Sequence, residues 1–249
     1  MLKTIAAVAC GVLVCATGTA SAQGFPLENK IFVNISGGGT TGASDVRQQF
    51  TFEYLLEPAT VDTTRRVGGG GLFDFTAGAS VIDNWVAGIS FTKSGGNSSA
   101  SYTGSIPDPI ETDLHRPVSG TINDMKHSES WFAFLAGYML PTFPALPDFM
   151  DKVELMVFAG PVRAGVKHEV VSAVTVTETG GAPVVSLDRR TISKGFWGIQ
   201  VGIDGRYMFT EHIGAGLFLR YQGASGDIVE GLNLDVGGFQ VAAGARIKF

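Results

Sequence analysis

The chain has 249 residues, with 18 basic and 23 acidic side chains and a formal net charge of −5. Its 34 glycines and 17 phenylalanines are unusual for a soluble enzyme of this length. A mildly acidic chain without a cluster of Lys and Arg argues against nucleic acid as a partner.

The first 22 residues have the parts of a secretory signal peptide. Lys3 gives a positive start, residues 5–16 form a short apolar stretch, and Ala20-Ser21-Ala22 supplies the small side chains of a cleavage site. The sequence predicts cleavage after Ala22 and one mature domain, residues 23–249. Both cysteines precede this site, so the mature domain is expected to have no disulfide.

Alternation of apolar and polar residues, the period of a β-strand, dominates from residue 30 onward. Residues 30–38 are expected to form a strand, and 48–66 alternates in part, with a tip expected at Glu57-Pro58. Three clearer hairpins follow: 72–81 with 85–92, 131–140 with 153–168, and 195–209 with 213–222. The last strand alternates as far as its terminal residue, Phe249.

The connections differ in length at the two ends of this sheet. The three hairpins turn over at one end, whereas 94–127, 169–192 and 223–234 are expected to form long polar loops at the other. This asymmetry is typical of outer-membrane barrels. The prediction is an all-β fold, a closed antiparallel up-and-down transmembrane β-barrel of about eight strands. Ten strands is the alternative, if 48–66 forms an additional membrane hairpin.

Alternation alone does not show which face of the sheet contacts water, because a soluble lipocalin-like barrel has the same period with its apolar face inward. Aromatic residues stand at both ends of single strand faces, as in Trp197 with Tyr207 and Phe239 with Phe249. Ten residues, tilted by about 40°, span roughly 25 Å, the height of the apolar band of an outer-membrane barrel. The opposite face is rich in glycine with a few charges. These features favour a membrane barrel whose aromatic girdle comprises Trp85, Tyr138, Trp197, Tyr207 and Tyr221.

The ending GGFQVAAGARIKF (237–249) resembles the C-terminal strand of bacterial outer-membrane proteins, where a terminal aromatic is read by the barrel assembly machinery. Residues 81–91, 105–121, 157–171 and 198–225 resemble a family of small outer-membrane β-barrels, of the OmpA/OmpX-like class, with no assigned role. The resemblance implies the outer membrane of a Gram-negative bacterium, with its lipids and lipopolysaccharide and the assembly machinery as partners. The assembly signal and membrane anchor are expected at Phe239, Val241, Ile247 and Phe249.

Seven charged residues are expected to point into the lumen: Asp74, Arg163, Asp204, Arg206, Arg220, Arg246 and Lys248. They could form a selectivity ring in a channel, or a pairing network that fills a narrow lumen. The second interpretation is favoured, because Phe218 also points inward. Placing Arg163 inward puts Met156, Phe158 and Val162 on the outer face.

The sequence predicts no catalytic, metal or cofactor site. His127-Ser128-Glu129 resembles part of a catalytic group, but three consecutive strand residues cannot converge on one point. The four histidines are scattered, without the spacing of metal ligands. We therefore expect a non-enzymatic structural or surface-interaction protein with a largely plugged polar lumen. A narrow porin-like diffusion channel is the alternative, and a soluble lipocalin-like barrel the third.

Overall fold

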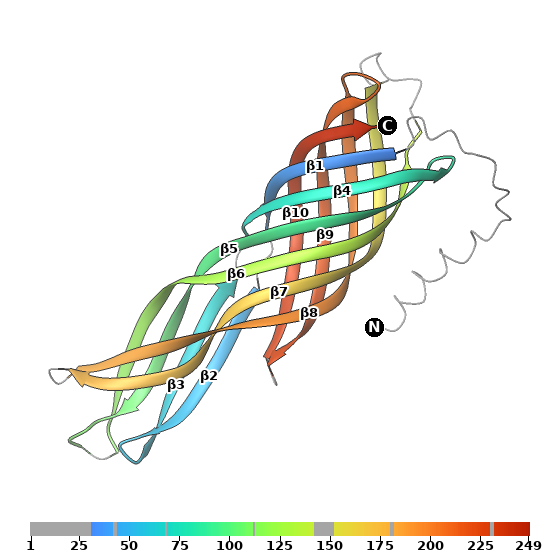
Figure 1. Ribbon diagram of the computed structural model, residues 1–249. Helices are drawn as coiled ribbons and strands as arrows, with labels where there is room; N and C mark the ends of the chain where they lie inside the picture. The colour runs from blue at the N-terminus through green and yellow to red at the C-terminus, as the bar shows by residue number, and fades with distance from the viewer. Residues whose placement is uncertain are drawn as a thin grey trace.

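The structure is a computed structural model that describes residues 31–41, 44–67, 69–111, 113–141, 152–179, 182–229 and 232–249. The predicted signal peptide and its cleavage site lie outside these residues. Within them the chain forms ten strands, and every pairing between strands is antiparallel (Figure 1). The strands are β1 (Ile31–Thr40), β2 (Ser44–Tyr54), β3 (Glu57–Val67), β4 (Gly71–Ile82), β5 (Trp85–Pro107), β6 (His115–Met139), β7 (Val153–Thr179), β8 (Ala182–Met208), β9 (Ile213–Val229) and β10 (Leu232–Lys248). No helix in these ranges is long and apolar enough to span a membrane.

Eight of the strands pair in a ring. The order β1-β4-β5-β6-β7-β8-β9-β10 returns to its start, because β10 pairs with β1 from Phe32 opposite Lys248 to Thr40 opposite Gln240. Backbone hydrogen bonds extend this pairing to the last residue, where Phe249 donates to Ile31 at 2.9 Å. The first and last strands of the ring therefore cover each other's edges.

The two remaining strands, β2 and β3, form a hairpin outside the ring. They pair with each other along their whole length, and β3 also pairs with residues 100–105 of β5. The chain turns at Leu55 and Leu56, both at positive φ, rather than at the expected Glu57-Pro58. The hairpin meets β5 well past its apolar outward residues, so 48–66 adds no strand to the ring itself.

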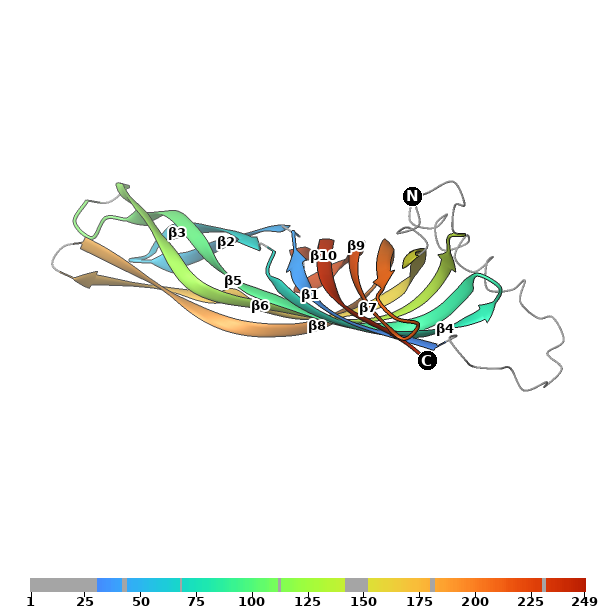
Figure 2. The same cartoon turned by 90° about the horizontal axis from the view of Figure 1, so that it is seen from above.

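The molecule is long because four ring strands continue past the ring. The strands β5 to β8 have 23, 25, 27 and 27 residues, so β7 and β8 are each about 90 Å long. Figures 1 and 2 show the ring at one end and an extension built from β2, β3 and the far parts of β5–β8 at the other. Hairpins thus occupy most of the segments expected to be long polar loops. We call this the long-hairpin end, and the end with turns 83–84 and 209–212 the short-turn end.

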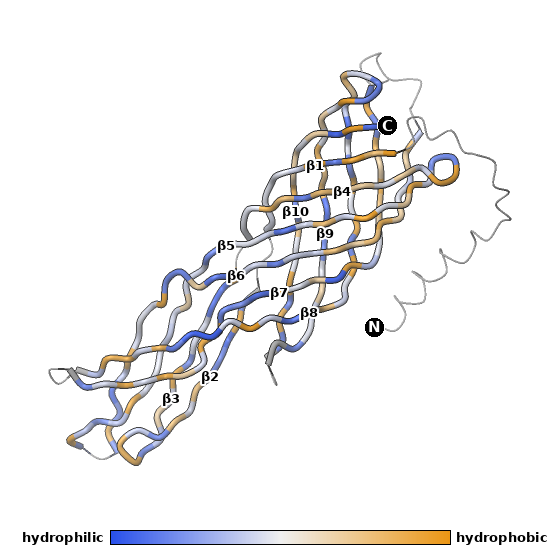
Figure 3. Tube along the Cα trace, in the orientation of Figure 1, coloured by the Kyte–Doolittle hydropathy of each residue, from blue (hydrophilic) through white to orange (hydrophobic). Residues whose placement is uncertain are grey.

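The outward face of the ring is apolar on every strand, and the inward face is mixed. Along β8, Trp197, Ile199, Val201 and Ile203 are exposed, whereas Gln200 and Asp204, at the other parity, are buried. Figure 3 shows the same alternation around the ring. The exposed large apolar residues of the ring form what we call the apolar belt: Ile35, Phe73, Phe75, Trp85, Ile89, Phe91, Phe132, Phe134, Leu155, Val157, Trp197, Ile199, Val201, Ile203, Tyr207, Ile213, Leu217, Leu219, Tyr221, Phe239, Val241 and Phe249. A lipocalin-like barrel would bury these side chains, so their exposure does not support that interpretation.

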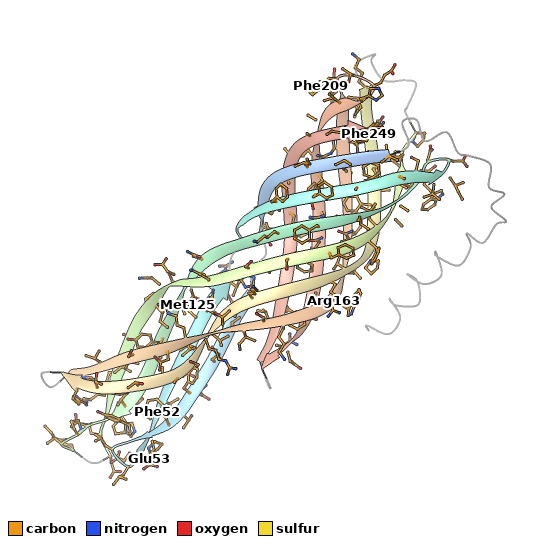
Figure 4. The ribbon with its side chains drawn as sticks, in the orientation of Figure 1. Phe52, Glu53, Met125, Arg163, Phe209 and Phe249 are labelled. Atoms are coloured by element: carbon orange, nitrogen blue, oxygen red, sulfur yellow. The ribbon has the colours of Figure 1, made fainter. Side chains whose placement is uncertain are left out.

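One predicted face is wrong, on β7. Met156, Phe158 and Val162 are buried inside the ring, at 1%, 8% and 0% exposure, and Arg163 points outward. Figure 4 shows Arg163 on the outside of the ring. Its guanidinium lies 5.3 Å from the centre of the Trp197 ring, where an aromatic face attracts a cation. Arg163 therefore belongs to the outer surface and not to the lumen.

Candidate functional site

The polar interior of the ring is the candidate site predicted from sequence. Five of the predicted lumen charges, Asp74, Asp204, Arg206, Arg220 and Arg246, are at most 2% exposed. They come from β4, β8, β9 and β10 and meet across the lumen. Lys248 lies at the short-turn end, where it forms an ion pair with Glu154 of β7.

One group of charges surrounds Asp204, which accepts hydrogen bonds with both carboxylate oxygens. Arg206 Nε donates to Oδ2 at 2.7 Å, and Arg246 Nη2 donates to Oδ1 at 2.6 Å. Asn34 Nδ2 also donates to Oδ2, at 3.3 Å, and Arg246 reaches Ser36 Oγ at 2.9 Å. The Asp204 cluster thereby joins β8 and β10 to β1 by charge-assisted hydrogen bonds.

A second group surrounds Asp74. Arg220 Nη2 donates to Asp74 Oδ2 at 2.9 Å, while the Thr92 and Thr76 hydroxyls donate at 2.7 and 2.9 Å. Arg220 also donates to Gln240 Oε1 at 2.6 Å. This Asp74 cluster links β4 and β5 to β9 and β10, so its ion pair crosses the lumen.

A row of glutamines extends the Asp74 cluster around the wall. Gln240 Nε2 donates to Gln222 Oε1 at 3.0 Å, Gln222 Nε2 to Gln200 Oε1 at 3.0 Å, and Gln200 Nε2 to the Phe134 carbonyl at 3.5 Å. All three side chains are at most 2% exposed. Each amide serves as donor to one neighbour and acceptor for another, which satisfies buried polar groups.

Apolar side chains fill the lumen above and below these charges. Phe32, Val86, Leu135, Met156 and Phe158 form one buried cluster, and Leu72, Phe218 and Ala242 another. The cavity bordered by Asp74, Asp204, Phe218 and Arg220 measures about 20 Å³, room for about one water molecule. Phe218 points into the lumen, as predicted, and is 5% exposed.

A third polar cluster was not predicted, and it lies at the long-hairpin end of the lumen. It consists of Arg65, His127, Glu129, Trp131 and His168, each at most 7% exposed. Arg65 Nη1 lies 3.4 Å from His168 Nε2, and a guanidinium only donates, so His168 carries its proton on Nδ1. His168 Nδ1 is 3.0 Å from His127 Nδ1, and His127 Nε2 is 2.8 Å from Glu129 Oε1. His168 Nδ1 then donates to His127 Nδ1, and His127 Nε2 donates to the Glu129 carboxylate.

The surroundings of His168 and Arg65 lower the pKa of both side chains. Burial, with the charge of Arg65 and the neighbouring His127, lowers the pKa of His168 to about 3. Burial lowers the pKa of Arg65 to about 10, so Arg65 remains charged at neutral pH. Trp131 Nε1 donates to the other oxygen of Glu129 at 3.0 Å. The signal in the sequence was the spacing of His127, Glu129 and Trp131 at every second residue, which places all three on one face and Ser128 on the other.

Arg65 connects the extension to the ring. Besides facing His168, it donates to Ser98 Oγ and to the Met125 carbonyl, both at 2.7 Å, and to the carbonyl of Glu169. Strand β3 is thus tied to β5, β6 and β7 by one side chain. A pocket of about 250 Å³ lies beside the cluster, lined by His127, Glu129 and Ser94 and by the glycines at 237–238, which have positive φ.

In the part of the chain that the structure describes, no group of three or more His, Cys, Asp or Glu side chains is arranged to hold a metal ion. The predicted girdle residues lie on the outer surface. Trp85 and Tyr138 meet edge to face at 5.2 Å between ring centres, as do Tyr221 and Phe239 at 5.3 Å. Of the predicted anchor residues, Phe239, Val241 and Phe249 are 45–57% exposed, and Ile247 is half-buried.

Comparisons with known proteins relate the chain to solved structures only. No protein-family model and no curated protein matches it. Neisserial surface protein A aligns at 14% identity over 88% of this chain and 97% of that chain, with a TM-score of 0.43. The outer membrane protein OprG from Pseudomonas aeruginosa aligns at 12% identity over 89% and 97%, with a TM-score of 0.42. The N-terminal β-barrel domain of Pseudomonas aeruginosa OprF aligns at 13% identity over 89% and 98%, with a TM-score of 0.37.

Proposed function

We propose that the mature chain is an integral β-barrel protein of a bacterial outer membrane, with a plugged lumen, no enzymatic activity and a structural or surface-interaction role. The identities and TM-scores above are low, so the proposal rests on the residues of this chain. The observation that carries it is the apolar belt, combined with ion pairs sealed inside the ring.

The apolar belt is too extensive for a surface in water. Soluble monomers rarely expose contiguous apolar patches larger than a few hundred Å². Here every ring strand contributes outward apolar residues, and the belt extends along β8 from Trp197, 63% exposed, to Tyr207, 39% exposed. Ten residues at this tilt cover roughly 25 Å, the height of a hydrocarbon core with its aromatic borders. Pairing of β10 with β1 leaves no free edge, as hydrocarbon requires.

The packed lumen supports a structural role over a channel. Asp74 forms an ion pair with Arg220, and Asp204 forms ion pairs with Arg206 and Arg246, so these buried charges neutralise one another inside the ring. A selectivity ring would leave such groups facing water along a continuous path. The cavity of about 20 Å³ between the two clusters is far smaller than an aqueous pore.

The extension supports contact with the exterior. The far part of β7 alone, from 164 to 179, reaches about 50 Å beyond Arg163. Its tip is held by polar contacts, since Glu178 accepts from Tyr54 Oη at 3.2 Å and pairs with Arg116. A rigid polar projection of this length suits a surface that meets molecules outside the cell. Outer-membrane lipids, lipopolysaccharide and the assembly machinery that reads Phe249 are the partners this proposal implies.

The test is insertion and ion conductance, measured on the same refolded mature chain. Trypsin added to vesicles should remove only segments of the extension and leave a protected ring fragment. In a planar bilayer the inserted chain should give no discrete conductance steps. Steps that change in size when Arg206 or Arg220 is neutralised would instead establish the narrow channel. Complete digestion in vesicles would refute the membrane location.

A further inference from the structure

The outer wall of β5–β7, where Arg163 lies, carries three exposed cations. Arg163, Lys93 and Lys167 all point outward and are exposed. Lys93 lies two residues beyond Phe91 on the same face of β5, and Arg163 lies two residues beyond Pro161 on β7. Lys93 and Arg163 therefore each follow an outward apolar residue at the border of the apolar belt toward the long-hairpin end, and Lys167 lies four residues beyond Arg163.

The register of the strands brings these three cations around one point. Ser130 of β6 is opposite Lys93 on one side and Gly165 on the other, and Gly165 lies midway between Arg163 and Lys167. With strands about 4.8 Å apart and about 3.3 Å per residue, the Cα atoms of the three cations lie within about 13 Å of one another. Their long side chains can reach a common ligand over Ser130.

The surface between the cations is hollow. A groove of about 350 Å³ is lined by Ser130, Gly165, Gly195 and Arg163, with Phe91 and Phe132 at its lower side. The glycines contribute no side chains to its floor, and a Cβ on Gly195 would lie 3.4 Å from Arg163 Nη2. The groove thus combines a polar floor, the guanidinium of Arg163 at its wall and an aromatic border, while Lys93 and Lys167 lie outside its lining, at neighbouring outward positions.

Cations outnumber acids on this wall. Among the described residues, no carboxylate forms an ion pair with Lys93, Arg163 or Lys167. The outward acid nearest along β7, Glu169, accepts from the backbone N–H of Lys126 at 2.7 Å. On the other side of the ring, β10 carries the exposed Asp235 at its long-hairpin end. An anion is therefore favoured at β5–β7 in particular.

We propose that this groove binds the phosphorylated headgroup of a lipid in the outer leaflet, namely the lipid A part of lipopolysaccharide. The inference rests on the membrane location proposed above, because long hairpins mark the extracellular side of such barrels. The cations contact the phosphates, the open floor accommodates the sugar, and the aromatic border packs against the acyl chains. The groove deepens the proposed function by giving the protein a specific lipid partner.

The experiment measures binding of diphosphoryl lipid A to the refolded mature chain in uncharged detergent micelles, by native mass spectrometry. Basic side chains near an anionic lipid surface contribute about fivefold each in affinity, so Lys93→Gln, Arg163→Gln and Lys167→Gln together should weaken binding roughly 100-fold. Arg47→Gln with Arg66→Gln is the control, because both arginines are exposed on the β2–β3 hairpin outside the ring, and Arg66 lies about 20 Å from Lys93. The control should bind as the wild type does.

Three results would overturn the inference: equal binding by the triple variant, equal loss in the control, or equally tight binding of phosphatidylglycerol or of lipid A without its phosphates. Insertion of every variant is checked separately by protease protection in phosphatidylcholine vesicles, which contain no lipid A. A chain that fails to insert there refutes the proposed function. A chain that inserts but shows no preference for lipid A refutes the groove alone.

Discussion

Replacing Arg220 by Met should strongly destabilise the ring, because it leaves the Asp74 carboxylate buried without a cation. Arg220 donates to Asp74, Thr92 and Gln240, and both members of the ion pair are at most 2% exposed. Methionine fills a similar volume, so the change removes charge and hydrogen bonds more than it removes packing. The two threonines that donate to Asp74 remain.

The magnitude follows from the burial of the pair. Removing one partner of a buried ion pair costs about 3–5 kcal/mol, whereas replacing both by apolar residues of similar size is often close to neutral. Arg220→Met should therefore cost about 3–5 kcal/mol, and Asp74→Leu a similar amount. The double variant should recover much of this loss, with a coupling energy of about 2–3 kcal/mol.

The assay is equilibrium unfolding by urea in vesicles, followed by tryptophan fluorescence, for the wild type, both single variants and the double variant. Arg163→Met is the control for loss of a charge, because Arg163 lies on the outer wall, and it should shift the midpoint little. Additive effects of Asp74→Leu and Arg220→Met would refute the reasoning, since they would show that the two side chains do not stabilise each other.

Three further predictions concern other parts of the ring. Native His168 stays neutral down to about pH 3, whereas the unfolded side chain takes up a proton below about pH 6.5. Acidification between these values should therefore remove at most about 5 kcal/mol of stability. His168→Asn should flatten the pH dependence of the urea midpoint, and an unchanged slope would contradict this. Gly244→Ala should destabilise the closure of β10 on β1 by about 1–3 kcal/mol, because its Cβ would lie 1.9 Å from the Ile35 carbonyl oxygen. Gly71→Ala is the control: its Cβ would have no atom within 4 Å, so it should be neutral in the same urea assay. Phe249→Ala should lower the amount of protease-resistant protein in the outer membrane of a Gram-negative host. Unchanged amounts would exclude an assembly role for the Phe249 side chain.

The faces of β8 and β9 could be predicted from sequence because their alternation is strict. On β8, from Trp197 to Tyr207, large apolar residues and one glycine alternate with Gly, Gln, Asp and Arg, so only one face can be turned to lipid. Strand β7 lacks this property. Val157 and Phe158 are both apolar, so the period does not select a face, and the charge of Arg163 was taken as the guide. A cation at the border of the belt extends its polar head out of the apolar layer, and its charge therefore does not mark the lumen.

The extension could not be predicted for a different reason. Its Ser, Thr and Gly content is typical of loops, and its strands are stabilised by partners far away in the chain. Arg65 illustrates this, because its hydrogen bonds reach Ser98, Met125 and Glu169 on three other strands. Local periodicity gave no sign of that convergence, and the cluster of His127 and His168 was missed for the same reason.

The closure of β10 on β1 joins parts of the chain that are far apart in sequence. Arg246 and Ser36, joined by a hydrogen bond in the Asp204 cluster, are 210 residues apart in the chain. Contacts of such sequence separation form late and slowly, because the loop between them must first lose its entropy. Until the last strand arrives, β1 has an open edge and the apolar belt has no partner, a state prone to aggregation. We therefore expect a chain without β10 to aggregate, because the edge of β1 and the Asp204 cluster would both lack partners.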